Sequence, residues 1–205
     1  MRRVLEARDV STLLHIIGAG ATGKSTLTRG LLGPQACDQQ EQGLPHGAKV
    51  AGAQGRYVVG NLKNGTDSVS EMVVAAATAN VLLQLRGVSL VIVDGVRSSA
   101  KWCVDWAHSP ECRATHLAYA YLDLSLDETL ERLRARRRGN GESDELSEKT
   151  VANVRAFQRR AHGVWRKVVQ RVDHPGKPTA LLVLREGTAA DWLERAEQFL
   201  THRVA

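Results

Sequence analysis

Few features of the sequence point to a secreted or membrane protein. The 205 residues include only three cysteines, an odd number with no C-x-x-C pair. This argues against a disulfide scaffold or a zinc site and for a reducing compartment. No apolar run approaches the length of about 20 residues that a membrane-spanning helix needs, and the charged N-terminus does not resemble a secretory signal. We therefore expect a cytoplasmic protein with no membrane partner.

Internal repeats and low-complexity segments are also missing. The apolar content of 43% and the charged content of 24% are ordinary for a globular protein. A chain of this length can form a sizeable core, and we expect a single domain over residues 1–205.

Short apolar runs alternate with helical stretches, which favours an α/β fold with a mainly parallel sheet. The predicted strands are Leu13–Ile17, Tyr57–Val59, Leu90–Val93, Leu117–Leu122 and Ala180–Leu184. We expect a three-layer sandwich, in which helices flank a five-stranded parallel sheet. Lys49–Ala51 and Arg56–Val59 can pair as a hairpin, and the Gly-, Pro- and Gln-rich stretch Gly33–Gly47 is expected to be a loop.

Apolar periodicity predicts helices over residues 25–32, 69–83, 125–138 and 147–172, and from about residue 188 onward. The third of these opens with Ser125-Leu-Asp-Glu128, which is a capping box. Trp165 and Trp192 fall on inward-facing positions, so we expect them to pack in the core. For Trp102 and Trp106, core packing is favoured over stacking on a base.

The stretch Gly18-Ala-Gly-Ala-Thr-Gly-Lys24-Ser25 matches the phosphate-binding pattern G-x-x-x-x-G-K-[ST] at every fixed position. It joins a predicted strand to a predicted helix, which is the context that the pattern requires. Glycines let backbone N–H groups turn inward, and the helix N-terminus adds partial positive charge. Lys24 is predicted to reach the β- and γ-phosphates of ATP, and the Ser25 hydroxyl to ligate Mg²⁺. The predicted nucleotide-binding residues are Gly18, Ala19, Gly20, Ala21, Thr22, Gly23, Lys24, Ser25 and Thr26.

A second signature is the apolar run Ser89-Leu-Val-Ile-Val-Asp94. A carboxylate at the end of such a strand is predicted to orient Mg²⁺, usually through water. The alternative is an Asp that merely caps the strand. Arg97 follows at the sheet edge where open α/β sheets bind ligands, so it is a candidate to clamp a substrate phosphate, with a surface Arg as the alternative.

The segment Gly60-Asn61-Leu-Lys63-Asn64-Gly65-Thr66-Asp67-Ser68 gathers an amide, an amine, a carboxylate and hydroxyls. Asn61, Lys63 and Asp67 are predicted to contact the substrate, with Asp67 as the general base for a hydroxyl acceptor. Alternatively, Asp67 or Ser68 caps the helix that follows. Asp38 is a weaker candidate for the base.

Positive charge is concentrated in two groups, on a chain of formal net charge +6. The first group is Arg132, Arg134, Arg136, Arg137 and Arg138. The second is Arg155, Arg159, Arg160, Arg166, Lys167 and Arg171. Such surfaces favour polyanions, including nucleic acid. The charge alone leaves open whether they bind nucleic acid, or whether the first group binds only ATP and the second is a solvated face.

The order of elements, with the arginine run Glu131-Arg132-Leu-Arg-Ala-Arg136-Arg after a strand, resembles P-loop kinases of the nucleoside monophosphate kinase type. The resemblance implies an arginine-rich lid over about residues 132–147. In that family, an Arg at the place of Arg132 covers the adenine and one at the place of Arg136 neutralises the transferring phosphate. Phosphoryl transfer depends on positioning and charge stabilisation, which a mobile arginine element supplies. The predicted catalytic set is Lys24, Asp67, Asp94 and Arg136.

The Gly-Asn-x-Lys-x-Gly-Thr-Asp pattern of residues 60–67, on a basic chain of this size, resembles the phage 5-hydroxymethyluracil DNA kinases. That family phosphorylates the hydroxymethyl group of the modified base within DNA, a step in thymine hypermodification. The resemblance implies an ATP- and Mg²⁺-dependent kinase with DNA as its partner, in the host cytoplasm if phage-encoded. Two other functions stay open: a kinase for a free nucleotide, nucleoside or other metabolite, and a P-loop NTPase or nucleotide-binding regulatory module.

Overall fold

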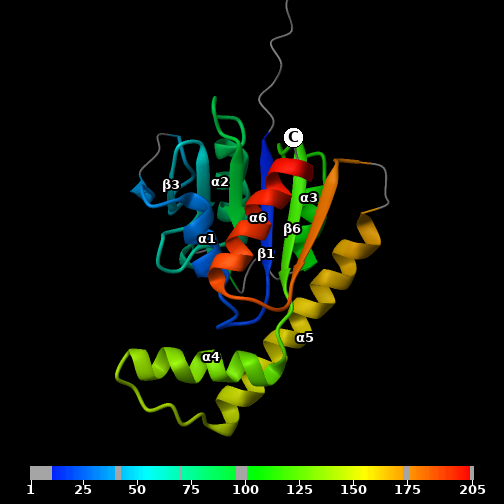
Figure 1. Ribbon diagram of the computed structural model, residues 1–205. Coiled ribbons are helices and arrows are strands. Elements are labelled where there is room, and N and C mark those ends of the chain that lie inside the picture. Colours follow the sequence, from blue (N-terminus) through cyan, green and yellow to red (C-terminus); the bar gives the residue numbers. More distant parts are fainter. Residues whose placement is uncertain (1–10, 40–42, 70, 96–100, 173–175, 204–205) are drawn as a thin grey trace, which may run out of the picture.

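The computed structural model describes residues 11–39, 43–69, 71–95, 101–172 and 176–203. It has an α/β fold in which helices cover both faces of one mostly parallel sheet (Figure 1). The strands are β1 (Thr12–Ile17), β2 (Cys37–Gln39), β3 (Val50–Ala53), β4 (Arg56–Val59), β5 (Leu90–Val93), β6 (His116–Leu122) and β7 (Thr179–Leu184). The helices are α1 (Lys24–Leu32), the 3₁₀ turn η1 (Thr66–Ser68), α2 (Met72–Leu82), α3 (Lys101–His108), α4 (Leu126–Gly139), α5 (Glu148–Arg171) and α6 (Ala189–Arg203).

The strands are ordered β2-β3-β4-β5-β1-β6-β7. The five predicted strands are present and form the parallel part of the sheet, from β4 to β7. The predicted count of five strands was wrong, because β3 and β2 extend the sheet at one edge as antiparallel strands. Strand β2 lies inside Gly33–Gly47, which was predicted to be a loop. Its three residues are exposed or half-buried, so they carry no apolar pattern that would reveal a strand.

The β3–β4 hairpin is confirmed: β4 has the predicted bounds, and β3 begins one residue and ends two residues later than predicted. Its connection is Gln54-Gly55, and both residues have positive φ angles, of 52° and 77°. Two positive φ angles in a two-residue turn match the right-handed twist of the flanking strands.

The central strand β1 is buried at all six positions because both of its faces carry helices. Leu13 and Ile17 pack with residues of α2, α3 and α5. Leu14 and Ile16 pack on the opposite face with residues of α1 and α6. This explains the continuous apolar run that predicted a buried strand. The connection after β1 therefore leaves on one face, while those after β4, β5 and β6 run over the other. Open α/β sheets bind ligands at the carboxyl ends of strands where the connections diverge in this way.

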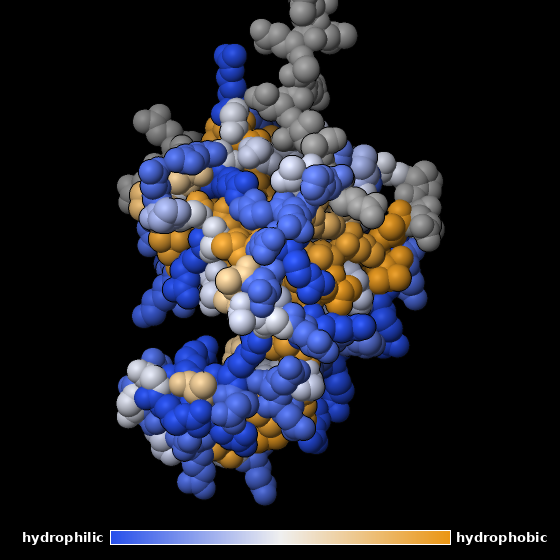
Figure 2. Space-filling model, in the orientation of Figure 1, coloured by the Kyte–Doolittle hydropathy of each residue, from blue (hydrophilic) through white to orange (hydrophobic). Residues whose placement is uncertain are grey.

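Helix α4 and the N-terminal half of α5 stand apart from the sheet, and we call them, with connection 140–147, the arm (Figure 1). The predicted capping box opens α4: the Glu128 N–H donates to Ser125 Oγ at 3.2 Å, and the Ser125 N–H donates to Glu128 Oε2 at 2.9 Å. Figure 2 shows a notch between the arm and the body. Within the described ranges, no helix is both long and apolar enough to span a membrane. Cys103 and Cys112 are buried free thiols, whereas Cys37 is an exposed free thiol.

Candidate active site

The loop between β1 and α1 is tightly wrapped; we call residues 18–25 the glycine loop. Gly23 precedes α1 with a φ of 98°, and Ala21 also has a positive φ, of 62°. Only glycine adopts such angles without strain, so Gly23 permits the turn into the helix. At Gly18 a Cβ atom would lie 2.8 Å from Thr22 Oγ1, so the loop closes on itself there. Alternating backbone conformations of this kind form anion-binding concavities.

Lys24 is the first residue of α1 and its ammonium group folds back over the glycine loop. Nζ donates hydrogen bonds to the carbonyl oxygens of Gly18 at 2.9 Å and Ala19 at 2.5 Å. Only 7% of the residue is exposed. Burial lowers the pKa of Lys24 to about 8, although the nearby carboxylates of Asp94 and Asp67 oppose the shift. The ammonium is thus held by weak neutral acceptors at the place where phosphates would bind.

Asp94, at the end of β5, is completely buried and has both carboxylate oxygens hydrogen-bonded. Oδ2 accepts from Thr28 Oγ1 at 2.7 Å, and Oδ1 accepts from the Thr66 N–H at 3.1 Å. The Asp94 N–H in turn donates to Thr66 Oγ1 at 3.1 Å. Burial raises the pKa of Asp94, while these hydrogen bonds and the Lys24 charge oppose the rise. Asp94 therefore lies behind the cleft wall, not on its surface.

Thr28 and Thr66 were missed by the sequence analysis. Both are buried and both bond Asp94. A weak signal was present, since Thr28 lies one helical turn after Lys24 and Thr66 directly precedes Asp67.

Asp67 lies in η1, and its carboxyl group rests against Gly95. A Cβ atom built on Gly95, which has a φ of 99°, would lie 2.6 Å from Asp67 Cγ. The alternative in which Asp67 or Ser68 caps the next helix does not hold, because α2 begins at Met72, after Glu71 at the N-cap position. The Ser68 hydroxyl instead accepts from the Asn61 N–H and donates to the Gly65 carbonyl, at 2.8 and 2.7 Å.

A cleft of about 540 Å³ brings most of the predicted site residues together between the glycine loop and the arm. Figure 2 shows the notch that it occupies. Its predicted residues from the loop and α1 are Gly20, Ala21, Thr22, Gly23, Lys24, Ser25 and Thr26. The other predicted residues of the cleft are Asp67 of η1, Lys63 of the loop before η1, and Arg132 and Arg136 of α4. The cleft is also lined by Arg29, Asn64 and Gly95. Gly18 and Ala19, also predicted site residues, accept hydrogen bonds from Lys24 Nζ through their carbonyl oxygens.

Among the described residues, the predicted substrate residue Asn61 is not in the cleft lining. Asn61 has a structural role, because its Oδ1 accepts from the Asn64 N–H at 2.8 Å and its backbone pairs with Gly65. Arg97 lies outside the described residues. Asp38, the weaker candidate base, lies in β2, where Oδ1 accepts from the Leu62 N–H at 2.8 Å. It therefore supports the outside of the same loop.

The arm arginines divide into two kinds. Arg134, Arg137 and Arg138 form ion pairs within the arm, with Glu131, Glu142 and Asp144. In the described part of the chain, no carboxylate lies within ion-pair distance of Arg132 or Arg136, and these are the two arm arginines that line the cleft. Uncompensated guanidinium groups in a cleft are available for an anion.

Arg132 is held in place by Trp192 and the glycine loop. Its guanidinium carbon lies 4.7 Å from the ring centroid of Trp192, and Nη1 donates to the Thr22 carbonyl at 3.3 Å. Trp192 is 2% exposed, and its Nε1 donates to the Glu186 carbonyl at 2.8 Å. The core role predicted for Trp192 is confirmed, and the ring additionally supports Arg132 through a cation–π contact.

The oxygen donors of the cleft suit Mg²⁺, which usually keeps several waters and binds one or two carboxylates together with substrate phosphates. The Ser25 hydroxyl and the Asp67 carboxylate line the cleft, with Asp94 behind them. No group of three or more His, Cys, Asp or Glu residues that could hold a metal occurs in the described ranges. A family-model scan finds no model that matches the chain, and a search of curated proteins finds no match. Function is therefore inferred from the site itself.

Proposed function

We propose that the protein is a P-loop kinase that uses ATP and Mg²⁺ to phosphorylate a hydroxyl group, with 5-hydroxymethyluracil in DNA as the acceptor. One observation carries the proposal: a single cleft holds the glycine-loop residues Lys24 and Ser25, the carboxylate of Asp67, and the two arm arginines without carboxylate partners. These are the groups that phosphoryl transfer needs for positioning and charge stabilisation.

The arrangement of the sheet supports a P-loop kinase fold. The glycine loop follows the central strand β1, and Asp94 ends the adjacent parallel strand β5. The arm is inserted between β6 and β7 and faces the cleft through α4. The antiparallel strands β2 and β3 are an addition at one edge, next to the loop that carries Asp67.

On this proposal the glycine loop binds the triphosphate. Its N–H groups and the N-terminus of α1 attract the phosphates, and Lys24 exchanges the carbonyls of Gly18 and Ala19 for phosphate oxygens. The Ser25 hydroxyl would hold Mg²⁺, which supplies charge neutralisation between the phosphates, and the buried Asp94 adds negative charge behind this site. Arg132, backed by Trp192, offers the outer face of its guanidinium to the adenine.

The transfer step is a displacement at the γ-phosphorus. The acceptor oxygen forms a bond to phosphorus, the bond to the β–γ bridging oxygen breaks, and ADP leaves. Asp67 accepts the proton of the acceptor hydroxyl, as an acceptor-positioned carboxylate does in other kinases. Arg136 stabilises the charge that develops on the transferring group. The small side of the cleft, next to Lys63 and Asn64, is where the acceptor would enter.

Three features support the DNA acceptor. The chain has a net charge of +6, and residues 60–67 resemble the corresponding loop of the 5-hydroxymethyluracil DNA kinases. Three residues of that loop, Lys63, Asn64 and Asp67, line the cleft. A base stacked in a duplex cannot reach the γ-phosphate, so the acceptor nucleotide must be unpaired or flipped out.

A transfer assay with labelled ATP tests the proposal. The acceptors are a 5-hydroxymethyluracil oligonucleotide, the matching thymine oligonucleotide and the free hydroxymethyl nucleotide, and Lys24→Ala is the inactive control, expected to lose at least ~10²–10³ in rate. We expect label only in the hydroxymethyl oligonucleotide. Label in the free nucleotide alone would identify a small-molecule kinase, and ATP hydrolysis without any labelled acceptor would identify an NTPase.

A further inference from the structure

A row of basic residues on α5 has a geometry that fits a polynucleotide strand. Arg155, Arg159, His162 and Arg166 follow each other at spacings of four, three and four residues, which places them on one face of the helix. All four are exposed. At about 1.5 Å per residue the row is about 16 Å long. We call these four residues the α5 row.

Among the described residues, the arginines of the α5 row have no carboxylate partner, in contrast to two basic residues near the C-terminal end of the helix. Arg160, which is not part of the row, lies over the Phe157 ring. Lys167 and Arg171 both pair with Asp105 of α3, in the case of Arg171 through Nη2 and Oδ1 at 2.6 Å. Across the described ranges, no carboxylate lies within ion-pair distance of Arg155, Arg159 or Arg166. The charge of the α5 row is therefore available to a ligand, whereas the charges of Lys167 and Arg171 are neutralised by Asp105.

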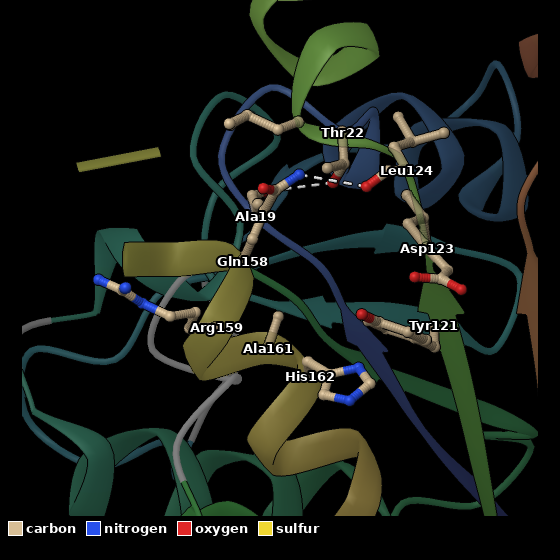
Figure 3. A pocket seen from close by; sticks show the side chains of 11 residues that line it. Ala19, Thr22, Tyr121, Asp123, Leu124, Gln158, Arg159, Ala161 and His162 are labelled. Carbon is tan, nitrogen blue, oxygen red and sulfur yellow. Dashed lines mark hydrogen bonds between the residues drawn. The ribbon is translucent and has the colours of Figure 1, made fainter. Parts of the chain in front are cut away.

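The α5 row leads to the reaction cleft. Arg159 and His162 line a second cavity of about 240 Å³, whose other walls come from the end of β6 and from Ala19 and Thr22 of the glycine loop. In Figure 3 the ring of His162 and that of Tyr121 face this cavity, while Arg159 extends outward from α5. Thr22 lines both cavities, so the cavity next to Arg159 and His162 adjoins the proposed nucleotide cleft at the glycine loop.

The second cavity has a polar wall that is already occupied by internal bonds. Gln158 Nε2 donates to the Leu124 carbonyl at 3.1 Å and to Thr129 Oγ1 at 3.2 Å (Figure 3). Asp123 accepts from Arg185 at 2.9 Å. The charged group left to meet a ligand on the rim is the Arg159 guanidinium, so the ligand of this surface is an anion.

We propose that the α5 row binds consecutive phosphates of the acceptor strand next to the reacting nucleotide. This rests on the proposed function, because it places a polymeric acceptor at the same cleft. Planar guanidinium groups bind phosphate oxygens in pairs, and the arginines are spaced about 6 Å apart where four residues separate them. Successive phosphates of one strand can therefore be bound by successive guanidinium groups of the row, whereas a free nucleotide would reach at most one of them.

The test compares two double variants with the same loss of charge. Arg159→Gln with Arg166→Gln removes two cations of the α5 row, and Lys167→Gln with Arg171→Gln removes the two that pair with Asp105. Binding of a fluorescein-labelled single-stranded thymine oligonucleotide is followed by anisotropy over a range of salt concentrations. The oligonucleotide carries no hydroxymethyl group, so binding is read without any transfer, and thermal melting verifies that each variant is folded.

For wild type we expect affinity to fall steeply with salt. The α5-row variant should lose roughly 1.4 from the log–log slope, at about 0.7 per contacted phosphate of a single strand, and the control variant should keep the wild-type slope. Equal slope losses in both variants, or wild-type binding that does not depend on salt, would overturn the α5 row as the phosphate track. Salt-dependent binding by the α5 row without phosphate transfer to hydroxymethyl DNA would support the α5 row as the phosphate track and refute hydroxymethyl DNA as the acceptor.

Discussion

Thr28 Oγ1 donates a 2.7 Å hydrogen bond to Asp94 Oδ2, which ties α1 to the end of β5. The other carboxylate oxygen accepts from the Thr66 N–H, one residue before Asp67. One buried carboxylate therefore joins three elements: α1 behind the glycine loop, the end of β5, and η1, which carries the proposed base. A buried charge with this many partners fixes the relative positions of the three elements.

Replacing Thr28 tests how strongly Asp94 depends on this bond. Thr28→Val keeps the shape of the side chain but leaves a buried carboxylate oxygen without its hydroxyl partner, and we expect a loss of about 2 kcal/mol in the free energy of unfolding. Thr28→Ser keeps the hydroxyl and loses one methyl group, at a cost of about 1 kcal/mol. Urea unfolding measures both. A Val variant as stable as wild type would show that the bond contributes nothing.

Gly65, in the loop before Asp67, cannot carry a side chain. Its φ is +54°, and a Cβ atom would lie 1.7 Å from Asp94 Oδ1. Gly65→Ala should therefore destabilise the fold by at least about 3 kcal/mol, because backbone strain alone costs about 1–3 kcal/mol. Gly163→Ala is the matched control, since nothing lies within 4 Å of its Cβ position inside α5. There we expect a small gain in stability. Similar unfolding curves for the two variants would contradict the close packing at Asp94.

The lowered pKa of Lys24 predicts that ATP binding takes up a proton at alkaline pH. Burial brings this pKa to about 8 in the free protein, so above pH 8 the amine is mostly neutral. Bound phosphates favour the ammonium and raise its pKa, so a proton must be taken up between about pH 8 and the ordinary pKa of about 10.4.

Isothermal titration calorimetry at pH 7 and pH 9, in buffers of different ionisation enthalpy, measures this uptake. We expect almost none at pH 7 and close to one proton at pH 9, with weaker ATP binding at the higher pH. Lys24→Arg should show no uptake at either pH, because a guanidinium is always charged. Equal proton uptake at both pH values in the wild type would contradict a neutral Lys24.

The two arginines of the cleft should have separable roles. Arg132→Ala should chiefly raise the ATP concentration required, because a cationic surface over the base is lost. Arg136→Ala should chiefly lower turnover, by ~10²-fold or more, because charge stabilisation in the transition state is lost. Arg134→Ala, which removes an arm arginine paired with Glu131, is the control and should change neither parameter substantially. The measurement is steady-state kinetics with varied ATP concentration. The same small effect in all three variants would indicate that the arm is a solvated surface without a role in the reaction.

The sequence predicted those parts of the molecule that are encoded locally. Four of the six residues from Thr12 to Ile17 are apolar because both faces of β1 are covered, and the glycine loop is a continuous pattern. Strand β2 could not be predicted, because its three residues contribute little to the core and its pairing with β3 defines it.

The partners of Asp94 could not be predicted either. Thr28 and Thr66 lie 66 and 28 residues away from it in the chain, and only the packing of α1 and η1 against β5 brings them together. The sequence also could not predict which arm arginines line the cleft. Arg132 and Arg136 differ from the neighbouring arginines only in the direction that α4 gives their side chains. The sequence thus predicted which kinds of residue the candidate site contains, whereas the contacts of each residue depend on parts of the chain that are distant in sequence.

Asp67 is the residue on which the proposed chemistry depends most. Asp67→Asn keeps the size of the side chain that packs on Gly95 but cannot accept the acceptor proton, so turnover should fall by ~10²–10⁴. ATP affinity should change much less. A variant that turns over normally would exclude Asp67 as the base.

Mass spectrometry of the acceptor gives the most direct test of the central claim. A single-stranded oligonucleotide with one 5-hydroxymethyluracil and blocked 5′ and 3′ ends is incubated with ATP, Mg²⁺ and either wild type or Asp67→Asn. We predict that wild type adds one phosphate to the modified base, that the variant adds almost none in the same time, and that the thymine oligonucleotide is unchanged. If the wild type consumes all the ATP and the hydroxymethyl base carries no phosphate, the proposed function is contradicted.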